Sequence, residues 1–276
     1  MTWFDSSVHR ALAEAVLVGA LGGVVGVHVL IRRLPFFTMA LTHATFPGIV
    51  IAALLGAGLY LGGGVFGLLI TLAVVLFSRV RGQDFTAATG IALAGGFALG
   101  VVLVSAQDGF AKDLTAYTVG DILAVSARDL AITAGIAAAV TLLLVVFRRE
   151  LLITAFDPVG AAALGLRTAL IDFILLAAVV VTVVATVPAL GVILTVALLV
   201  GPAATARLLT DRYALLFPIS AAIGVSCGVA GVWLSTVWNV AAGASIALLV
   251  GVVFGLVFLG SHGAALVRRR AAARPL

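Results

Sequence analysis

Residues 168–187, TALIDFILLAAVVVTVVATV, form a continuous apolar run in which Asp172 is the only charged side chain. A membrane-spanning helix needs roughly 20 such residues, because the hydrocarbon core of a bilayer is about 30 Å thick. Inside lipid, a helix also satisfies its own backbone hydrogen bonds. This stretch therefore predicts a helix that spans a membrane.

The rest of the chain has the same character. It has 276 residues, of which 63% are hydrophobic and 10% are charged, and its mean hydropathy is +1.31. A soluble domain carries about 25% charged residues. We therefore expect an all-α polytopic membrane protein with one transmembrane domain over residues 1–276. Residues 1–10 lack the basic start and the cleavage site of a signal peptide, so the first apolar run should be a retained helix.

Apolar windows predict nine membrane elements. In chain order they are 11–31, 38–58, 61–78, 88–106, 129–147, 168–187, 190–206, 213–236 and 241–260. The seventh lies between Pro188 and Pro202, so it would be broken or re-entrant and leave eight full spans. The glycines of GALGG (19–23) and GGG (62–64) should let neighbouring helices pack closely.

Lysine and arginine are distributed unevenly between the predicted loops. With the N-terminus outside, 13 of the 16 basic residues face the cytoplasm, which is the usual bias of membrane proteins. These 13 are Arg32, Arg33, Arg79, Arg81, Arg148, Arg149, Arg167, Arg207, Arg212, Arg268, Arg269, Arg270 and Arg274. The count predicts an N-out, C-in protein of a bacterial inner membrane. Since the basic residues form no patch, nucleic acid is not an expected partner.

The predicted outer loop, 107–128, is acidic. It carries Asp108, Asp113 and Asp121, which would attract a cation or the basic surface of a partner. A plainly solvated loop is the alternative.

No phosphate-binding loop of the form G-x-x-x-x-G-K-[ST] occurs in the chain, because its only lysine, Lys112, follows Ala111. The chain is therefore no ATPase, and transport would use an ion gradient or a separate ATPase subunit. The inner segment 150–167 contains a short helix candidate, with Asp157 as its cap and Pro158 at its first position. That helix would dock a cytosolic motor or simply lie on the membrane surface.

Four segments resemble the ABC-3 family of permeases, which serve bacterial zinc, manganese and iron uptake. They are GVVGVHVLIRRLPFFTMALTHATFPGI (23–49), VGDILAVSARDL (119–130), TAFDPVGAAALGL (154–166) and GVILTVALLVGPAATARLLTDR (191–212). The resemblance implies a fold similar to vitamin B12-type importer permeases and a permease homodimer in the lipid bilayer. It also implies two cytosolic ATPase subunits that hold ATP and Mg²⁺, and a metal-binding receptor on the outside that meets Asp113 and Asp121.

The resemblance also assigns two inner contact segments. The coupling helix would comprise Phe156, Asp157, Pro158, Ala161, Ala162, Ala163, Leu164, Gly165 and Leu166. A second cytoplasmic contact would comprise Gly201, Pro202, Arg207, Asp211 and Arg212. The alternative function is a secondary cation transporter driven by an ion gradient, for which Asp172 and the Pro188–Pro202 element are the only support.

His43 and Met39 are the main candidates for contact with the transported metal, because they share one face of the second element and imidazole binds Zn²⁺, Mn²⁺ and Fe²⁺. The alternative is a histidine bonded to a neighbouring carbonyl. The family pattern GDALSHA has an aspartate where this chain has Met39. A soft thioether in place of a hard carboxylate disfavours Mn²⁺ relative to softer ions, so the sequence leaves zinc, manganese and iron open.

Three further ionisable residues lie within predicted spans. His28 would add a second imidazole to the pathway or lie at the membrane interface. Glu14 would line an entrance or face lipid headgroups. Asp172 would form a local ion pair with Arg167, five residues before it. A charged group inside a membrane is costly and suggests a function by default.

Overall fold

The structure is a computed structural model that describes residues 6–78, 80, 84–106, 120 and 122–272, with side chains for all of these except 188 and 262–272. Asp113 and Asp121, and most of the predicted outer loop, lie outside the described residues. Arg79 and Arg81 do as well.

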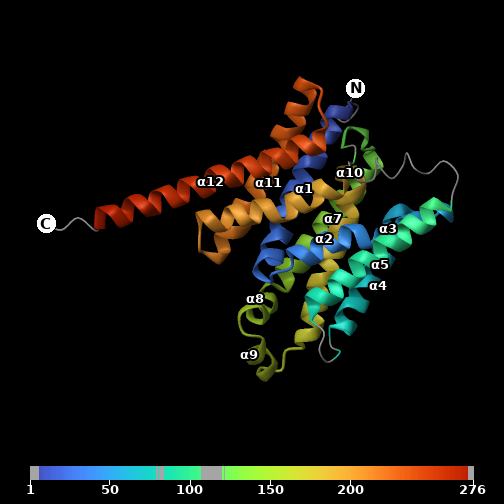
Figure 1. Cartoon of the computed structure of the whole chain (residues 1–276), viewed down its shortest axis with the longest axis horizontal. Helices are drawn as coiled ribbons and strands as arrows, with labels where there is room; N and C mark the ends of the chain where they lie inside the picture. The colour runs from blue at the N-terminus through green and yellow to red at the C-terminus, as the bar shows by residue number, and fades with distance from the viewer. Residues whose placement is uncertain (1–5, 79, 81–83, 107–119, 121, 273–276) are drawn as a thin grey trace.

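Within the described part, every regular element is a helix (Figure 1). The elements are α1 (Ser7–Ile31), α2 (Pro35–Ala44), α3 (Phe46–Leu54), α4 (Leu59–Phe77), α5 (Phe85–Ser105), the 3-10 turn η2 (Ile122–Ala124), α7 (Ala127–Val146), α8 (Arg148–Phe156), α9 (Pro158–Ala163), α10 (Thr168–Leu209), α11 (Tyr213–Trp238) and α12 (Ala242–Ala272). These residues contain nine helical stretches that are long and apolar enough to cross a membrane. The predicted all-helical, nine-element architecture is confirmed.

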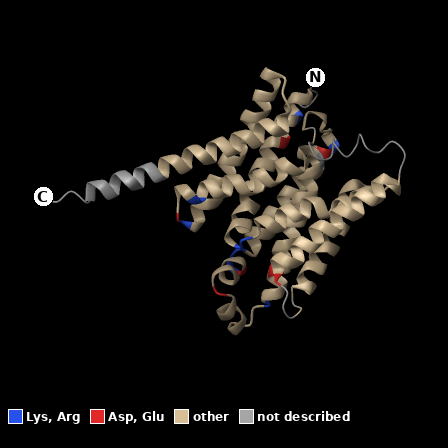
Figure 2. Cartoon of the chain, in the orientation of Figure 1, with Lys and Arg blue, Asp and Glu red and all other residues tan. Residues whose placement is uncertain are grey.

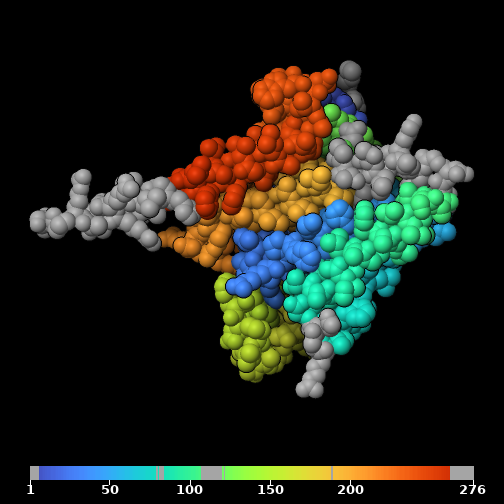
Figure 3. Space-filling model, in the orientation of Figure 1, coloured from blue at the N-terminus to red at the C-terminus, as the bar shows by residue number. Residues whose placement is uncertain are grey.

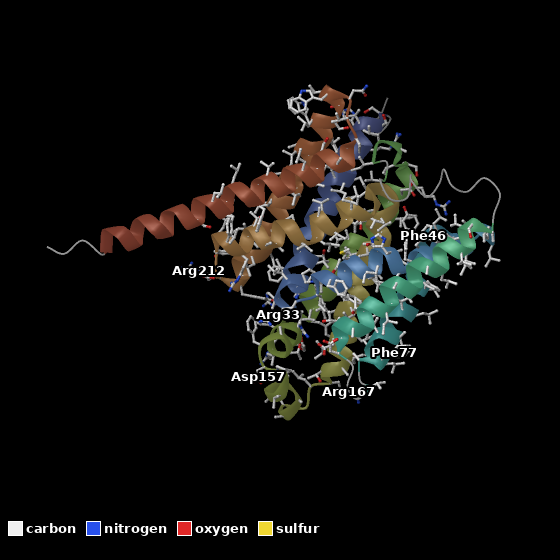
Figure 4. All side chains as sticks on the ribbon, viewed as in Figure 1. Arg33, Phe46, Phe77, Asp157, Arg167 and Arg212 are labelled. Carbon is white, nitrogen blue, oxygen red and sulfur yellow. The ribbon has the colours of Figure 1, made fainter. Side chains whose placement is uncertain are left out.

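Charged side chains gather near the ends of the helices, and the long middle stretches are almost free of them (Figure 2). One end, called here the basic end, carries Arg33, Arg167 and Arg212 along one edge of the molecule, together with Asp157 (Figure 4). The opposite end is where α1 begins. The charge pattern therefore matches a helical bundle with two chemically different faces.

The seventh predicted element, Ala189–Leu209, has 21 residues and is long and apolar enough to span a membrane. The backbone is helical at both Pro188 and Pro202, the prolines that bound the prediction. The break lies at its start, where Gly191 has φ 76° and ψ 169° and separates the two halves of α10. A Cβ on Gly120, which has φ +70°, would lie 2.2 Å from the Gly191 nitrogen. Glycine readily adopts the positive φ of both residues, and it has no Cβ that would clash at this contact.

The second predicted element, 38–58, consists of two helices, α2 and α3, that meet at Thr45. Pro47 lies at the start of α3, where a missing N–H is tolerated because the first helical turn has no partner for it. Together the two helices form one candidate span, Pro35–Leu54.

The glycine-rich motif of α1 packs as expected. A Cβ on Gly19 would lie 2.7 Å from the backbone carbon of Gly224 in α11, so these two helices touch through their backbones. Such contacts replace the hydrophobic effect as the driving force for helix association in lipid. In the GGG stretch, Gly62 makes an equally close approach to Gly48, whereas a Cβ on Gly64 would meet open space.

Buried threonines of the bundle bond to the carbonyl four residues earlier in their own helix. Thr71, Thr182, Thr195 and Thr205 donate to such oxygens over 2.8 Å each. This local bond satisfies the hydroxyl in an apolar interior. Other polar side chains of the described residues bond across helices, and these mark the sites described next.

Candidate functional site

The first site is one face of α2. Met39 and His43 lie one helical turn apart, and Met39 is 44% exposed, whereas His43 is only partly exposed. Met39 lines an open groove of about 430 Å³ together with Val196 and Val200 of α10 and Val250 of α12. His43 is not among the groove residues. Its ring meets Phe97 of α5 edge to face, with 5.6 Å between the ring centroids.

His28 lies elsewhere in the bundle. It is 5% exposed, and its ring centroid is 5.2 Å from that of Phe217 on α11. It lines a cavity of about 580 Å³ together with residues of α7, α8 and α11. Neither Met39 nor His43 lines that cavity. The structure therefore gives His28 different neighbours from the α2 pair.

Glu14 is fully buried, so the alternative in which it faces lipid headgroups was wrong. Its Oε1 accepts a hydrogen bond from Thr133 on α7 over 2.9 Å. Its Oε2 is buried with no hydrogen-bond partner among the described residues. Asp129, one turn before Thr133, accepts a bond from the Tyr60 hydroxyl over 2.9 Å. Two carboxyl groups thus lie near the opposite end, where one oxygen remains available to a ligand or a proton.

Among the described residues, no three His, Cys, Asp or Glu side chains gather closely enough to hold one metal ion together. The ionisable groups of the spans are instead spread over separate places, with His43 beside α5, His28 beside α11 and Glu14 beside α7.

The predicted coupling segment forms a protruding pair of short helices, α8 and α9, at the basic end (Figure 1). Asp157 caps α9 by accepting a hydrogen bond from the Gly160 N–H over 2.8 Å, and Pro158 begins that helix. These local predictions are confirmed. Gly165, with φ +80°, follows the last turn, where glycine ends helices at the lowest cost.

The outward surface of this pair is apolar. Phe156, Val159 and Leu164 are 69%, 79% and 74% exposed. In Figure 3, helices α8 and α9 form a yellow-green lobe at the lower edge of the molecule. Ala161, by contrast, is fully buried, so it supports the lobe from inside, whereas Ala162 and Ala163 lie on its surface.

The second predicted contact segment is divided by the fold. Arg207, Asp211 and Arg212 are exposed at the basic end, and Arg207 forms an ion pair with Asp211 over 3.4 Å. Both residues of that pair line a cavity of about 420 Å³ with Phe156. The structure therefore brings the end of this segment to the coupling lobe.

The start of the segment lies deeper in the bundle. Pro202 is buried, and Gly201 lines the Met39 groove, where its added Cβ would lie 2.1 Å from Val250 of α12. Gly201 and Pro202 therefore lie about 9 Å before Arg207 along α10, and their part in a cytoplasmic contact stays a prediction.

Asp172 does not pair with Arg167. Residues five positions apart point about 140° apart around a helix, so the two side chains diverge. Asp172 instead forms an ion pair with Arg32, at the end of α1. Arg32 also donates to the Thr154 hydroxyl and, over 3.2 Å, to the Leu151 carbonyl of α8. One guanidinium thus joins α1, α8 and α10.

Sequence reasoning missed the roles of Arg32, Thr154, Thr133 and Tyr60. The signal for Arg32 was present, since a pair of arginines follows an apolar run, but nothing local distinguishes Arg32 from Arg33. The two differ because Arg33 has a positive φ of 56° and an exposed side chain.

Comparison with known proteins adds the family context. Residues 5–261 match the sequence model of the ABC 3 transport family. The chain is 37% identical over 256 residues to the manganese transport system membrane protein MntC of Halalkalibacterium halodurans, across 93% of this chain and 88% of that protein. It is 32% identical over 254 residues to the manganese import system permease protein ScaB of Streptococcus gordonii, across 91% and 90%.

Solved structures share the fold. PsaBC from Streptococcus pneumoniae, in complex with Fab, superposes with a TM-score of 0.83 and 33% identity, with 90% of each chain covered. A metal-chelate type ABC transporter in an inward-facing conformation gives a TM-score of 0.72 at 19% identity, across 91% of this chain and 85% of that chain. The second similarity concerns the fold alone.

Proposed function

The chain belongs to the ABC 3 transport family, and from that premise we propose that it is the membrane-spanning permease subunit of an ATP-driven importer of a divalent metal ion. Manganese is the substrate proposed first. The observation that carries this proposal is the 37% identity, over 93% of the chain, to a protein named as part of a manganese transport system.

The energy would come from a separate ATPase dimer that docks at the basic end. Three features support this docking. The chain has no phosphate-binding loop of its own, the lobe of α8 and α9 exposes Phe156, Val159 and Leu164, and Arg207 and Asp211 border the same cavity as Phe156. An apolar centre with a charged rim is the usual composition of a protein interface.

The basic end would face the cytoplasm of a bacterial inner membrane. The described arginines support this orientation. At the basic end, Arg33, Arg167 and Arg212 are labelled in Figure 4, Arg148 and Arg149 begin α8, Arg32 bonds to α8, and Arg207 lines a cavity with Phe156. Arg10, which bonds to Val125, and Arg128, in the first turn of α7, belong to the opposite end. A metal-binding receptor would then dock at the opposite end, and two copies of the chain would form the permease.

Metal would pass the α2 face. Met39 and His43 provide a thioether and an imidazole on that face, and the Met39 groove is open. Mn²⁺ binds nitrogen and sulfur donors less tightly than the later first-row metals do. With this donor set, passage of manganese would depend on weak contacts and on selection by the receptor.

Co-expression of the tagged chain with the ATPase and receptor encoded beside its gene tests this proposal. We expect the ATPase to co-purify, and its ATP hydrolysis to rise when the receptor loaded with Mn²⁺ is added, more than with the Zn²⁺-loaded or Fe²⁺-loaded receptor. A stable chain that transports metal along an ion gradient without any ATPase would overturn the proposal in favour of a secondary transporter.

A further inference from the structure

A cavity of about 580 Å³ opens at the basic end between α1, α7, α8 and α11. Its volume falls within the roughly 300–1,000 Å³ range of small-molecule sites. Nothing in the transport proposal uses this cavity. The Met39 groove lies between α2, α10 and α12 instead.

The cavity has an apolar part and a basic part, which follow one another along α7. Val24, Leu144 and Phe217 line its apolar wall. Arg148 and Arg149, which follow the last turn of α7, line the basic part. Since Thr141 also lines the cavity, its wall follows α7 for about 10 Å from the membrane interior to the arginines.

The cavity is open to the surroundings of the bundle. Val145, on its wall, is 57% exposed, and Arg148 and Arg149 are exposed as well. A molecule with a long apolar part could therefore enter from the bilayer, with its polar part level with the arginines.

The two arginines have no acidic partner in the described part of the chain. The ion pairs found there are Arg32–Asp172 and Arg207–Asp211. Other acids near the basic end are already engaged, because Asp84 and Asp157 cap helices. Glu150, the neighbour of Arg149 on α8, forms no ion pair with either arginine and does not line the cavity. No carboxylate of the described residues is therefore ion-paired with Arg148 or Arg149, and an anion bound in the cavity would supply a complementary charge.

We propose that this cavity binds an anionic phospholipid of the leaflet at the basic end, with its phosphate on Arg148 and Arg149 and an acyl chain along Val24, Leu144 and Phe217. Guanidinium groups bind phosphate oxygens through paired N–H donors. Basic pockets between membrane helices bind anionic headgroups in the same manner. The bound lipid would fill the space between the coupling lobe and the bundle, independently of which ion is transported.

Native mass spectrometry of the purified chain, with added phosphatidylglycerol or phosphatidylcholine of matched acyl chains, tests the proposal. We expect phosphatidylglycerol to bind at least tenfold more tightly than phosphatidylcholine. The double variant R148Q/R149Q should lose about tenfold or more of the phosphatidylglycerol affinity, since each basic residue near a headgroup contributes about a fewfold gain in binding. The matched control R33Q/R167Q removes the same charge at the same end and should change the affinity by less than twofold.

A second pair of variants tests the apolar wall without changing any charge. Val145→Trp should obstruct the cavity and lower the binding of both lipids, whereas Val146→Trp, at a position that is 61% exposed and does not line the cavity, should not. Equal binding of the two lipids, or unchanged binding in R148Q/R149Q, would overturn the proposal. Cross-linking of Val145→Cys between two copies of the chain in membranes would also overturn it, because a second copy would then cover the cavity.

Discussion

Met39 and His43 lie one helical turn apart on α2, and the proposed metal path passes both side chains. A carboxylate at position 39 would be a harder ligand than the thioether, so Met39→Asp should raise the uptake of Mn²⁺ relative to Zn²⁺ by about threefold or more. Competition between the two ions in an uptake assay measures the ratio. Met39→Asn has nearly the shape of the aspartate without its charge, and an equal shift in that variant would contradict the explanation.

His43→Ala tests the other member of the pair. Loss of the imidazole should lower metal uptake about tenfold and leave the amount of folded protein unchanged, because the ring is partly exposed and meets the Phe97 ring edge to face. Uptake of radioactive Mn²⁺ by cells, normalised to protein in the membrane, is the measurement. Full activity would reduce His43 to a packing residue.

The hydrogen bond from Thr133 to Glu14 links α7 to α1 inside the bundle. Thr133→Val removes the only bond that the described residues make to this buried carboxyl, and it should lower the free energy of unfolding by about 0.5–2 kcal/mol. Thr182→Val is the matched control, because the Thr182 hydroxyl bonds only within its own helix. Thermal unfolding in detergent compares the two. Equal losses would show that the bond between helices adds nothing.

At the scale of residues, the sequence identified which side chains are unusual but not which of them meet. Met39 and His43 could be placed on one face because helical spacing alone determines it. The partner of Asp172 could not be predicted, because Arg32 lies 140 positions away in the chain and only the packing of α1 against α10 brings the two together. Glu14 was expected to line an entrance or to face headgroups, and it is buried in the bundle, where Thr133 of α7 bonds to it.

At the scale of elements, Arg32 links the lobe of α8 and α9 to the bundle. Its guanidinium binds Asp172 of α10 and both Thr154 and Leu151 of α8. Arg32→Gln should therefore lower the free energy of unfolding by about 1–2 kcal/mol, and it should lower the number of ions imported per ATP hydrolysed. Arg33→Gln removes the same charge from an exposed neighbour and serves as the control. Identical behaviour of the two variants would contradict this role.

The exposed apolar side chains of α8 and α9 are expected to bind the ATPase. Val159→Glu should abolish co-purification of the ATPase, because it places a charge in the centre of an apolar contact, and it should leave the fold intact since Val159 is 79% exposed. Leu55→Glu, at the equally exposed Leu55 (77%) in the turn between α3 and α4, is the control. Retention of the ATPase by the Val159 variant would exclude this lobe as its docking surface.

The cap of α9 was predictable from Asp157 and Pro158, because capping depends on residues that are adjacent in the chain. The burial of Ala161 was not, since it depends on the neighbours that the lobe finds in the bundle. The break in α10 lies at Gly191 and not at Pro188 or Pro202, because it also depends on a neighbour that is distant in the chain. Prolines are the obvious helix breakers, but the glycine beside Gly120 provides the positive φ that the turn requires.

Across the whole molecule, the nine-element fold followed from apolar length, because a span of roughly 20 residues is dictated by bilayer thickness. The two ends could be distinguished from charge alone, and the described arginines are divided between them as expected. The transported ion could not be derived in this way. It depends on weak contacts at the α2 face and on partner proteins, and neither leaves a pattern in hydropathy.

Reconstitution tests the central claim most directly. Proteoliposomes that contain the chain and its ATPase, supplied with Mn²⁺-loaded receptor on one side and ATP on the other, should accumulate Mn²⁺ only when ATP can be hydrolysed. Accumulation should stop with a non-hydrolysable ATP analogue and persist when ion gradients are dissipated by ionophores. Uptake that continues without ATP, or that ends when the gradients are dissipated, would contradict the account.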